Sequence, residues 1–384
     1  MVVVGATAVV VTRSTGSDPE DARSTEGAPD DGGPSGAAGG WVVQEVGNDP
    51  FAANDTTVCT AALRAVLYCV DARTGDELFS QQLDNGPPDS AVLLEDRLLV
   101  SNPGAPTGEL DAFSLEGERL WRTPLGVSAR QQLPVVDGVV TVVDSEEGPA
   151  ELVGVDVADG RERWRAFTGG YERPHVDSPR VFTDGVRVYT GVERIDPIEA
   201  AVVGNIAAVD PASGETLWTS PQLDDIGRGD GIAAAAPFDD GSAVAFLMDG
   251  RPRRIVVLDA ATGQLRWEVP VAFGRADIVH ADGTTVVSDG PDMRAYDAEG
   301  RQLWEAPSPV FEQSPGPVER DELVFDDGRL FLVGFDVYEV DPATGASRLV
   351  HERPGASDAA VVGDHLVIAG VTELEAVPLA SIGR

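Results

Sequence analysis

Short apolar runs that alternate with polar turn residues recur along most of the chain. Seven of these runs lead into a turn that ends in glycine, and a Trp, Phe or Leu stands four residues after that glycine. The strings VDVADGRERW, VDPASGETLW and LDAATGQLRW show the pattern most fully, with turn glycines at Gly160, Gly214 and Gly263. The glycines recur about every 45 residues, which is the length of one four-stranded β-propeller blade.

Each repeat has a physical interpretation. A strand ends at an Asp whose carboxylate accepts backbone N–H groups of the turn, and glycine takes the positive φ that other residues resist. The aromatic residue of the next strand then removes roughly 150 to 250 Å² from water when it packs between sheets. We expect these docking residues to be Trp41, Trp121, Trp164, Trp218, Trp267 and Trp304, with Phe79 and Leu349 in the same place in weaker form. We expect backbone bonding rather than metal binding from the repeated aspartates Asp71, Asp156, Asp210, Asp259, Asp297 and Asp341.

Between successive docking turns the chain supplies two further strands, as in SPRVFTDGVRVYTG and ELVFDDGRLFLVG, where a glycine turn splits a β-branched run. Four short antiparallel strands per unit favour radial closure. The C-terminal stretch supplies three strands without a docking strand, and WVVQEV begins at Trp41 without a preceding turn. The sequence therefore predicts an all-β, eight-bladed β-propeller of four-stranded antiparallel blades, closed by N- and C-terminal strands that share one blade. Seven blades remain an alternative if the first or last unit is degenerate.

The strings AVDPASGETLW and VLDAATGQLRW resemble the tryptophan-docking repeat of the pyrroloquinoline quinone (PQQ)-like β-propellers. The resemblance covers nearly all of the chain after residue 40 and implies the eight-bladed fold. It leaves function open, because this superfamily includes quinoprotein dehydrogenases, outer-membrane assembly lipoproteins, sensor domains of membrane kinases and many envelope proteins.

The chain divides into three parts by composition. Residues 1–13 hold a short apolar run, residues 14–40 are rich in Gly, Pro, Ser and Asp and read as a disordered linker, and residues 41–384 form the propeller. Ten apolar residues are too few to span a bilayer. The run is interpreted as part of a truncated membrane anchor, a short signal segment or an accidental apolar terminus. We expect the first of these, with the propeller outside the cytoplasm and anchored to the cell membrane.

Cys59 and Cys69 are the only cysteines. The stretch TTVCTAALRAVLYCV predicts a hairpin that places them opposite each other, where a disulfide is geometrically possible. Two buried thiols are the alternative, and an oxidising compartment favours the disulfide.

The net charge of −37 argues against nucleic-acid binding, which needs clustered cations. All 28 basic residues apart from histidine are arginines. We expect a monomeric propeller whose partner is a protein or a small anionic ligand at the cell envelope.

Catalytic signals are weak. Quinoprotein dehydrogenases generally hold their cofactor between a Trp and a disulfide of adjacent cysteines, and this chain has no Cys-Cys pair. The histidines His175, His280, His351 and His365 lack zinc spacing, and His280 and His365 are expected to be solvated at hairpin turns. We expect no cofactor, no metal and no catalytic residue.

If the propeller binds a ligand, the mouth of the central channel is the expected place. Candidates lie before the inner strands, where arginines are able to attract a carboxylate, phosphate or glycan, or else form ion pairs with neighbouring acids. These candidates are Arg130, Tyr171, Arg173, His175, Arg228 and Arg275, with Asp358 beside them. The insertion from Val192 to Asn205 is a second candidate, expected to be a loop.

The sequence thus favours a non-enzymatic, membrane-tethered or secreted scaffold for interaction or ligand sensing at the bacterial cell envelope. The alternative is a PQQ- or metal-dependent quinoprotein oxidoreductase or another envelope enzyme. An outer-membrane assembly propeller is a third option.

Overall fold

The computed structural model describes residues 40–44, 51–62, 65–84, 86, 88–102, 108–126, 133–144, 150–167, 172–174, 180–195, 202–220, 232–248, 253–271, 277–310, 322–334, 336–352, 356–370 and 373–382. The predicted N-terminal segment 1–13, and all of the predicted linker 14–40 except its last residue, lie outside these ranges. Within them, no helix is long and apolar enough to cross a membrane.

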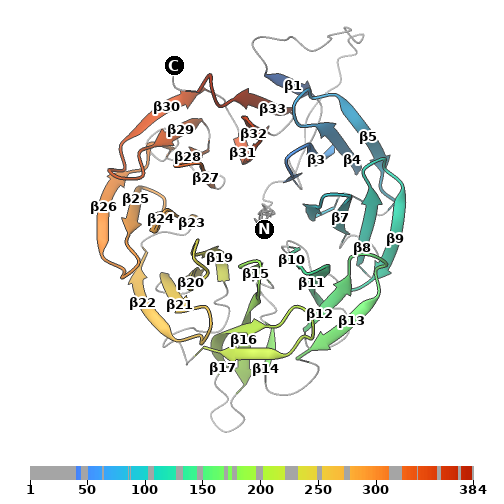
Figure 1. Ribbon diagram of the computed structural model, residues 1–384, viewed down its shortest axis with the longest axis horizontal. Helices are drawn as coiled ribbons and strands as arrows, with labels where there is room; N and C mark the ends of the chain where they lie inside the picture. The colour runs from blue at the N-terminus through green and yellow to red at the C-terminus, as the bar shows by residue number, and fades with distance from the viewer. Residues whose placement is uncertain are drawn as a thin grey trace, which may run out of the picture.

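The described residues form eight antiparallel sheets that stand as blades around one central axis (Figure 1). We number the blades 1 to 8 in chain order. Blade 1 comprises β2 (Phe51–Ala53), β3 (Thr57–Ala62), β4 (Val66–Asp71) and β5 (Glu77–Gln82). Blade 2 comprises β6 (Ser90–Leu93), β7 (Arg97–Asn102), β8 (Glu109–Ser114) and β9 (Arg119–Pro124). Blade 3 comprises β10 (Val135–Val136), β11 (Val139–Asp144), β12 (Glu151–Asp156) and β13 (Glu162–Ala166). Blade 4 comprises β14 (Glu172–Pro174), β15 (Val181–Thr183), β16 (Val188–Ile195), β17 (Val202–Val209) and β18 (Thr216–Thr219).

The second half of the ring follows the same plan. Blade 5 comprises β19 (Ile232–Pro237), β20 (Ala243–Met248), β21 (Arg254–Asp259) and β22 (Leu265–Pro270). Blade 6 comprises β23 (Asp277–Ala281), β24 (Thr284–Ser288), β25 (Asp292–Tyr296) and β26 (Gln302–Pro307). Blade 7 comprises β27 (Glu322–Asp326), β28 (Arg329–Val333), β29 (Val337–Val340) and β30 (Ser347–His351). Blade 8 comprises β31 (Ala356–Val362), β32 (His365–Gly370) and β33 (Glu373–Pro378), to which β1 (Trp41–Gln44) adds the outer strand.

The predicted fold and its closure are confirmed. β1 pairs antiparallel with β33, from Trp41 opposite Ala376 to Gln44 opposite Glu373, so the two ends of the propeller share one sheet. In Figure 1 the blue β1 lies beside the red β33. Closure pairs the first described strand with the last, so the edge of β33 that faces β1 is not left open.

Blade 4 departs from the four-strand expectation. Its second strand β16 is eight residues long and pairs with two short strands, β14 and β15, on the same side. The insertion from Val192 to Asn205 was expected to be a loop, but its two ends belong to β16 and β17, which pair as far as Ile195 and Val202. The expectation was wrong for these ends because the insertion lengthens a hairpin; residues 196–201 lie outside the described ranges.

The hydrophobic core consists of eight clusters, each lying between two neighbouring blades. Between blades 4 and 5, for example, Tyr189 and Phe246 are completely buried and their rings contact edge-on at 5.5 Å. Strands inside the blades therefore carry buried apolar side chains on both faces, as in β20, where all six residues are buried, and this explains the continuous apolar runs in the sequence.

Each tryptophan contacts the docking turn of the next blade. The Trp218 indole donates its Nε1–H to the Ala260 carbonyl at 3.0 Å, and the ring lies against Gly263, where an added Cβ would stand 2.3 Å from Cε3. The other indoles donate in the same way from Trp41 to Ala72, Trp121 to Val157, Trp164 to Pro211, Trp267 to Ala298 and Trp304 to Pro342. Glycine is thus required at the docking position for two reasons: its φ is positive, and the aromatic ring that covers it leaves no room for a Cβ atom.

A disulfide joins the two cysteines. Cys59 and Cys69 lie directly opposite each other on β3 and β4, with 4.1 Å between their Cα atoms, and both side chains are fully buried. The disulfide is therefore an internal cross-link of blade 1.

Candidate functional site

Of the six residues predicted at the channel mouth, four fall in the sequence between two blades, and Arg173 and His175 fall within blade 4. Arg130, Tyr171, His175, Arg228 and Arg275 lie outside the described residues. The backbone of Arg173 forms part of β14, but its side chain lies outside them as well. These six residues therefore remain a prediction.

Described acids at the start of the inner strands have a structural role. The Asp277 carboxylate accepts the Leu323 backbone N–H at 2.9 Å, and the Glu322 carboxylate accepts the Ala359 N–H at 2.7 Å. Each bond joins the inner strand of one blade to that of the next. Asp358, named with the channel-mouth candidates, is buried with only 6% of its surface exposed.

The repeated docking-turn aspartates bind their own backbone. Asp210 Oδ1 accepts the N–H groups of Ala212 at 2.7 Å and Ser213 at 3.0 Å. The backbone N–H of Ala158 bonded to Asp156 holds the pKa of that carboxyl below its usual value, and Asp259 has a lowered pKa chiefly because Arg266 donates to it. A carboxyl group stabilised as the anion within its own turn is poorly suited to act as a general base.

The histidines differ from the expectation that they would be solvated. His280 is only 8% exposed, its ring stacks on Phe238 at 3.6 Å, and its Nδ1 lies 2.9 Å from the Thr285 hydroxyl. Burial lowers the pKa of His280, against the opposing charges of Asp239 and Asp240. His365 is also buried. The prediction of solvated rings was wrong for both residues, and for His280 the reason is that Phe238 of blade 5 covers its ring.

The groups that would hold a quinone cofactor are not brought together among the described residues. All six tryptophans lie on outer strands with their indole N–H groups bonded, and the single disulfide is buried inside blade 1. No three His, Cys, Asp or Glu side chains in the described ranges lie close enough to bind one metal ion. These residues therefore do not fit PQQ bracketed by a tryptophan and a disulfide.

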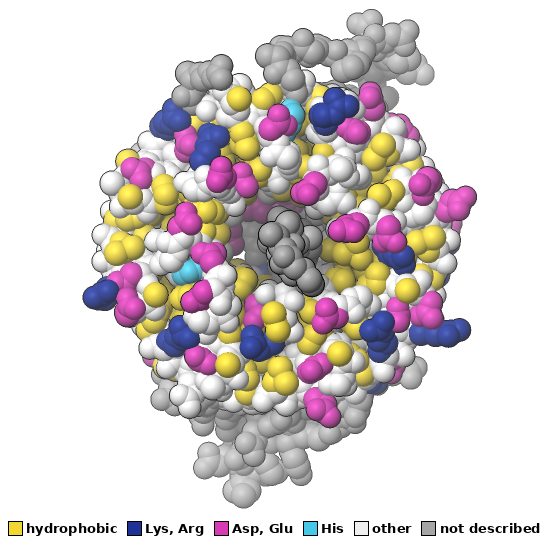
Figure 2. Space-filling model, in the orientation of Figure 1, with side chains coloured by type: hydrophobic (Ala, Val, Ile, Leu, Met, Phe, Trp, Pro, Cys, Tyr) yellow, Lys and Arg dark blue, Asp and Glu magenta, His cyan; other side chains and the backbone are white. Residues whose placement is uncertain are grey.

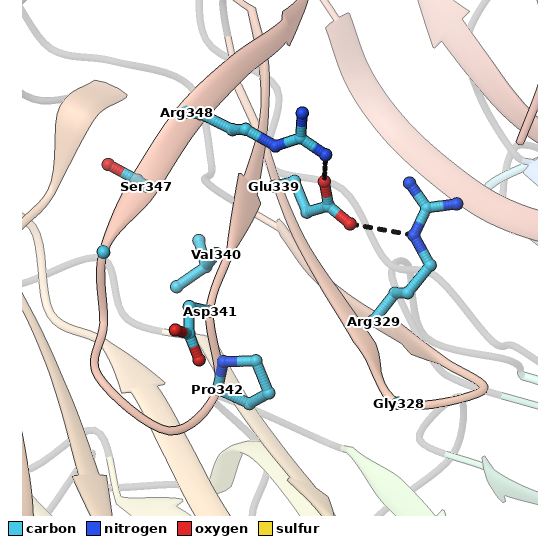
Figure 3. A pocket seen from close by; sticks show the side chains of 9 residues that line it. Gly328, Arg329, Glu339, Val340, Asp341, Pro342, Ser347 and Arg348 are labelled. Atoms are coloured by element: carbon cyan, nitrogen blue, oxygen red, sulfur yellow. Dashed lines mark hydrogen bonds and ion pairs between the residues drawn. The ribbon is translucent and has the colours of Figure 1, made fainter. Parts of the chain in front are cut away.

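One shallow pocket of about 370 Å³ lies on blade 7 (Figure 3). Arg348 and Arg329 point at Glu339 from two sides; Arg329 Nε donates to it at 2.9 Å, and Arg348 also donates to it. Burial alone would raise the pKa of Glu339, but the two arginines hold it below its usual value. The pocket already contains the carboxylate that its arginines bind, so its charges largely compensate one another.

One face of the ring carries short, acidic turns. Because strands alternate in direction, the turns between inner and second strands leave on the same face as the docking turns, which we call the turn face. In all eight blades these inner turns hold at least one carboxylate: Asp55, Glu95, Asp96, Asp137, Asp184, Asp239, Asp240, Asp282, Asp326, Asp327 and Asp364. Most are exposed, although Asp96 pairs with Arg97 at 2.6 Å and Asp184 with Arg187 at 2.9 Å. Figure 2 shows acidic side chains spread all around one face of the ring.

The acidic inner turns follow from local chemistry. Asp137, Asp282 and Asp327 adopt positive φ just before a glycine that also has positive φ, as two-residue hairpin turns require. The glycine turns are predicted from the sequence, but the common face of their acids is not. The Asp-Gly pair, which occurs in five of the eight inner turns, is the signal that would have revealed it.

Comparisons with known proteins agree with this geometry. The family model described as "Outer membrane protein assembly factor BamB" matches residues 28–173, 106–192 and 203–368. Among curated proteins, no significant match was found.

Solved structures with similar folds serve different functions. BamB from Moraxella catarrhalis has a TM-score of 0.64 at 14% identity, covering 88% of this chain and 98% of that one. The quinohemoprotein alcohol dehydrogenase ADHIIG from Pseudomonas putida HK5 has a TM-score of 0.63 at 13% identity, covering 90% and 77%. The computationally designed Ika8 protein has a TM-score of 0.63 at 14% identity, covering 87% and 99%. At such identities these structures support the fold alone, whereas the family model spans most of the sequence. The chain belongs to the family of PQQ-like β-propellers described as outer membrane protein assembly factor BamB.

Proposed function

We propose that this protein is a non-catalytic scaffold of the bacterial cell envelope that binds partner proteins on the faces of a rigid ring. One observation carries the proposal: the described side chains most able to act in catalysis or cofactor binding are already engaged in contacts within the propeller. The docking aspartates bind backbone, the indoles bind the next blade, and the disulfide is buried. Membership of the BamB family supports an assembly role at the envelope.

The turn face favours a cationic partner surface. Carboxylates recur at all eight inner turns, and the whole chain carries a net charge of −37. Complementary charge raises association rates and excludes partners of like sign. A basic protein surface therefore fits this face better than the small anionic ligand considered from the sequence.

We further propose an extracytoplasmic location with membrane attachment through residues 1–13. The buried disulfide supports an oxidising compartment, since such bonds are rare in the cytosol. Fractionation of cells that express the full chain tests the location; release into the soluble cytosolic fraction would contradict it.

Photocross-linking in cells tests the scaffold role. A photoreactive residue at Asp137 or Asp282 samples the acidic inner turns, and the same residue at exposed Leu217 on the outer strand β18 serves as a matched control. We expect discrete cross-linked species from the inner turns that disappear when salt is raised, because exposed charges are screened. Equal labelling at all three positions would contradict a partner on the turn face.

The runner-up function is a PQQ- or metal-dependent oxidoreductase. The six channel-mouth candidates belong to the hypothesis that the propeller binds a ligand. We propose that they serve recognition rather than catalysis, and substitution of Arg228 or Arg275 by Gln should then alter partner binding without creating or abolishing a redox activity.

A further inference from the structure

The eight interfaces between blades are not equivalent. At six of them a tryptophan donates an indole hydrogen bond to the next blade. These six residues are all the tryptophans of the chain. The remaining two interfaces, between blades 1 and 2 and between blades 7 and 8, have Phe79 and Leu349 in the docking position.

Phe79 packs against the next blade, but its side chain cannot donate a hydrogen bond to it. Its ring lies against Gly117, where an added Cβ would stand 2.9 Å from Cδ2. A phenyl ring has no N–H to donate, so the interface between blades 1 and 2 lacks the hydrogen bond of the tryptophan interfaces. Its inter-blade polar contacts include Asn54 Nδ2 to the Leu94 carbonyl at 2.9 Å and the exposed pair of Arg119 with Asp84.

Leu349 buries a smaller fraction of its surface between blades than Phe79 does, since it is 42% exposed. Blade 8 has no docking turn, because its third strand β33 and its outer strand β1 come from opposite ends of the propeller. The residues after β33 cover this interface instead. Ile382 is buried in the cluster between blades 7 and 8, and Arg329 donates to the Leu379 carbonyl at 3.2 Å and to the Ile382 carbonyl at 3.5 Å.

The two interfaces without a tryptophan bracket one pair of blades. Blades 8 and 1 are joined to each other by Trp41, which is 5% exposed and donates to the Ala72 carbonyl at 2.8 Å. We call these two blades the closure segment. Blades 2 to 7 form an uninterrupted series of tryptophan interfaces on the other side.

The disulfide lies inside the closure segment, beside its boundary with blade 2. Cys69 is the direct cross-strand neighbour of both Cys59 and Phe79, and all three belong to the cluster between blades 1 and 2. We propose that the closure segment unfolds locally as one cooperative unit while blades 2 to 7 stay folded, and that the Cys59–Cys69 disulfide suppresses this opening by restricting the unfolded chain of blade 1. The ring is therefore closed more firmly in an oxidising compartment than in a reducing one, whatever its partner.

The chemistry requires a dithiol reductant. Its thiolate attacks one cysteine sulfur and a mixed disulfide forms; the second thiolate of the reductant then resolves it. The protein disulfide gains two electrons and two protons as Cys59 and Cys69 become thiols, while the dithiol becomes a cyclic disulfide. Because both sulfurs are fully buried, the reductant reaches them only when blade 1 opens.

Hydrogen–deuterium exchange on the full chain tests the proposal, comparing the oxidised protein with the double variant Cys59→Ala/Cys69→Ala. The cross-link closes a loop of 10 residues in sequence separation, and such a loop restricts the opened chain by about 30- to 150-fold. We expect protected amides of β3, β4, β32 and β33 to exchange faster by that factor in the double variant. Amides of β20 and β21 should change by less than about 3-fold, the scatter expected for distant sites.

Two outcomes would overturn the proposal: equal acceleration in all blades, or acceleration confined to β3 and β4 without blade 8. Trp267→Phe is the matched control, because it creates a phenylalanine interface between blades 5 and 6. It should accelerate exchange there by about 5-fold, the value of one hydrogen bond, and leave β32 and β33 unchanged. Faster exchange of blade 8 in this control would also contradict a separate closure segment.

Discussion

Substitution of a docking glycine separates backbone strain from the contact with the neighbouring indole. Gly263 has a φ of +70°, and an added Cβ would stand 2.3 Å from Trp218 Cε3. Gly283 has nearly the same φ, +73°, but nothing lies within 4 Å of its added Cβ. The pair Gly263→Ala and Gly283→Ala therefore shares the backbone cost and differs in the clash.

The magnitudes follow from those distances. The left-handed conformation costs an alanine about 1 to 2 kcal/mol, which is all that Gly283→Ala should lose. In Gly263→Ala the indole must also move, which adds about 1 to 3 kcal/mol of overpacking and about 1 kcal/mol for the bond to the Ala260 carbonyl. We expect Gly263→Ala to lose about 3 to 6 kcal/mol in total.

Urea denaturation followed by far-ultraviolet circular dichroism measures both variants. Equal denaturant dependence in the two variants keeps the free energies comparable. A difference below about 0.5 kcal/mol between Gly263→Ala and Gly283→Ala, within the usual scatter of such measurements, would refute the docking interpretation.

Three further predictions concern stability. Trp218→Ala should cost roughly 3 to 5 kcal/mol by the same assay, because it leaves a cavity between blades 4 and 5, and a silent substitution would contradict its packing role. His280 has a pKa below 6.5 in the folded protein, so the unfolded chain takes up its proton first as pH falls; the free energy of unfolding should decline from pH 7.5 to 5.5, and His280→Gln should remove that part of the decline. Reduction of Cys59–Cys69 should lower the free energy of unfolding by about 2 to 3 kcal/mol, and an unchanged urea midpoint would contradict a stabilising cross-link.

The repeat made the fold predictable from sequence. The docking turn needs an Asp that bonds its own backbone and a glycine at positive φ, so both recur at fixed spacing from the aromatic residue. The repeat does not reveal which docking glycine each tryptophan contacts. Trp218 covers Gly263 of the next unit rather than Gly214 four residues before it, because the contact crosses between blades.

The environment of single side chains was harder to predict. His280 stands at a hairpin end where solvent exposure is usual, but Phe238 of the preceding blade covers its ring. Arg348 corresponds to Arg266, which bonds the docking Asp259, yet Arg348 bonds Glu339 instead. The partner of each side chain depends on which residue lies nearest in space, and the repeat pattern does not contain that information.

The connections between blades were the least predictable part of the candidate site. Their lengths vary from blade to blade, and no turn chemistry repeats in them. In blade 4 an insertion that read as a loop extends a hairpin. The acidic inner turns, by contrast, were visible in the sequence as Asp-Gly pairs and needed only the alternation of strand direction to be assigned to one face.

The claim that the ring is a scaffold rather than a cofactor enzyme is tested most directly by a titration of the purified full chain with PQQ in the presence of Ca²⁺. The absorbance of the quinone and the melting temperature of the protein are followed together. The account predicts no saturable change in either signal. A saturable spectral shift with a matching rise in melting temperature would contradict it and identify the protein as a quinone-binding protein.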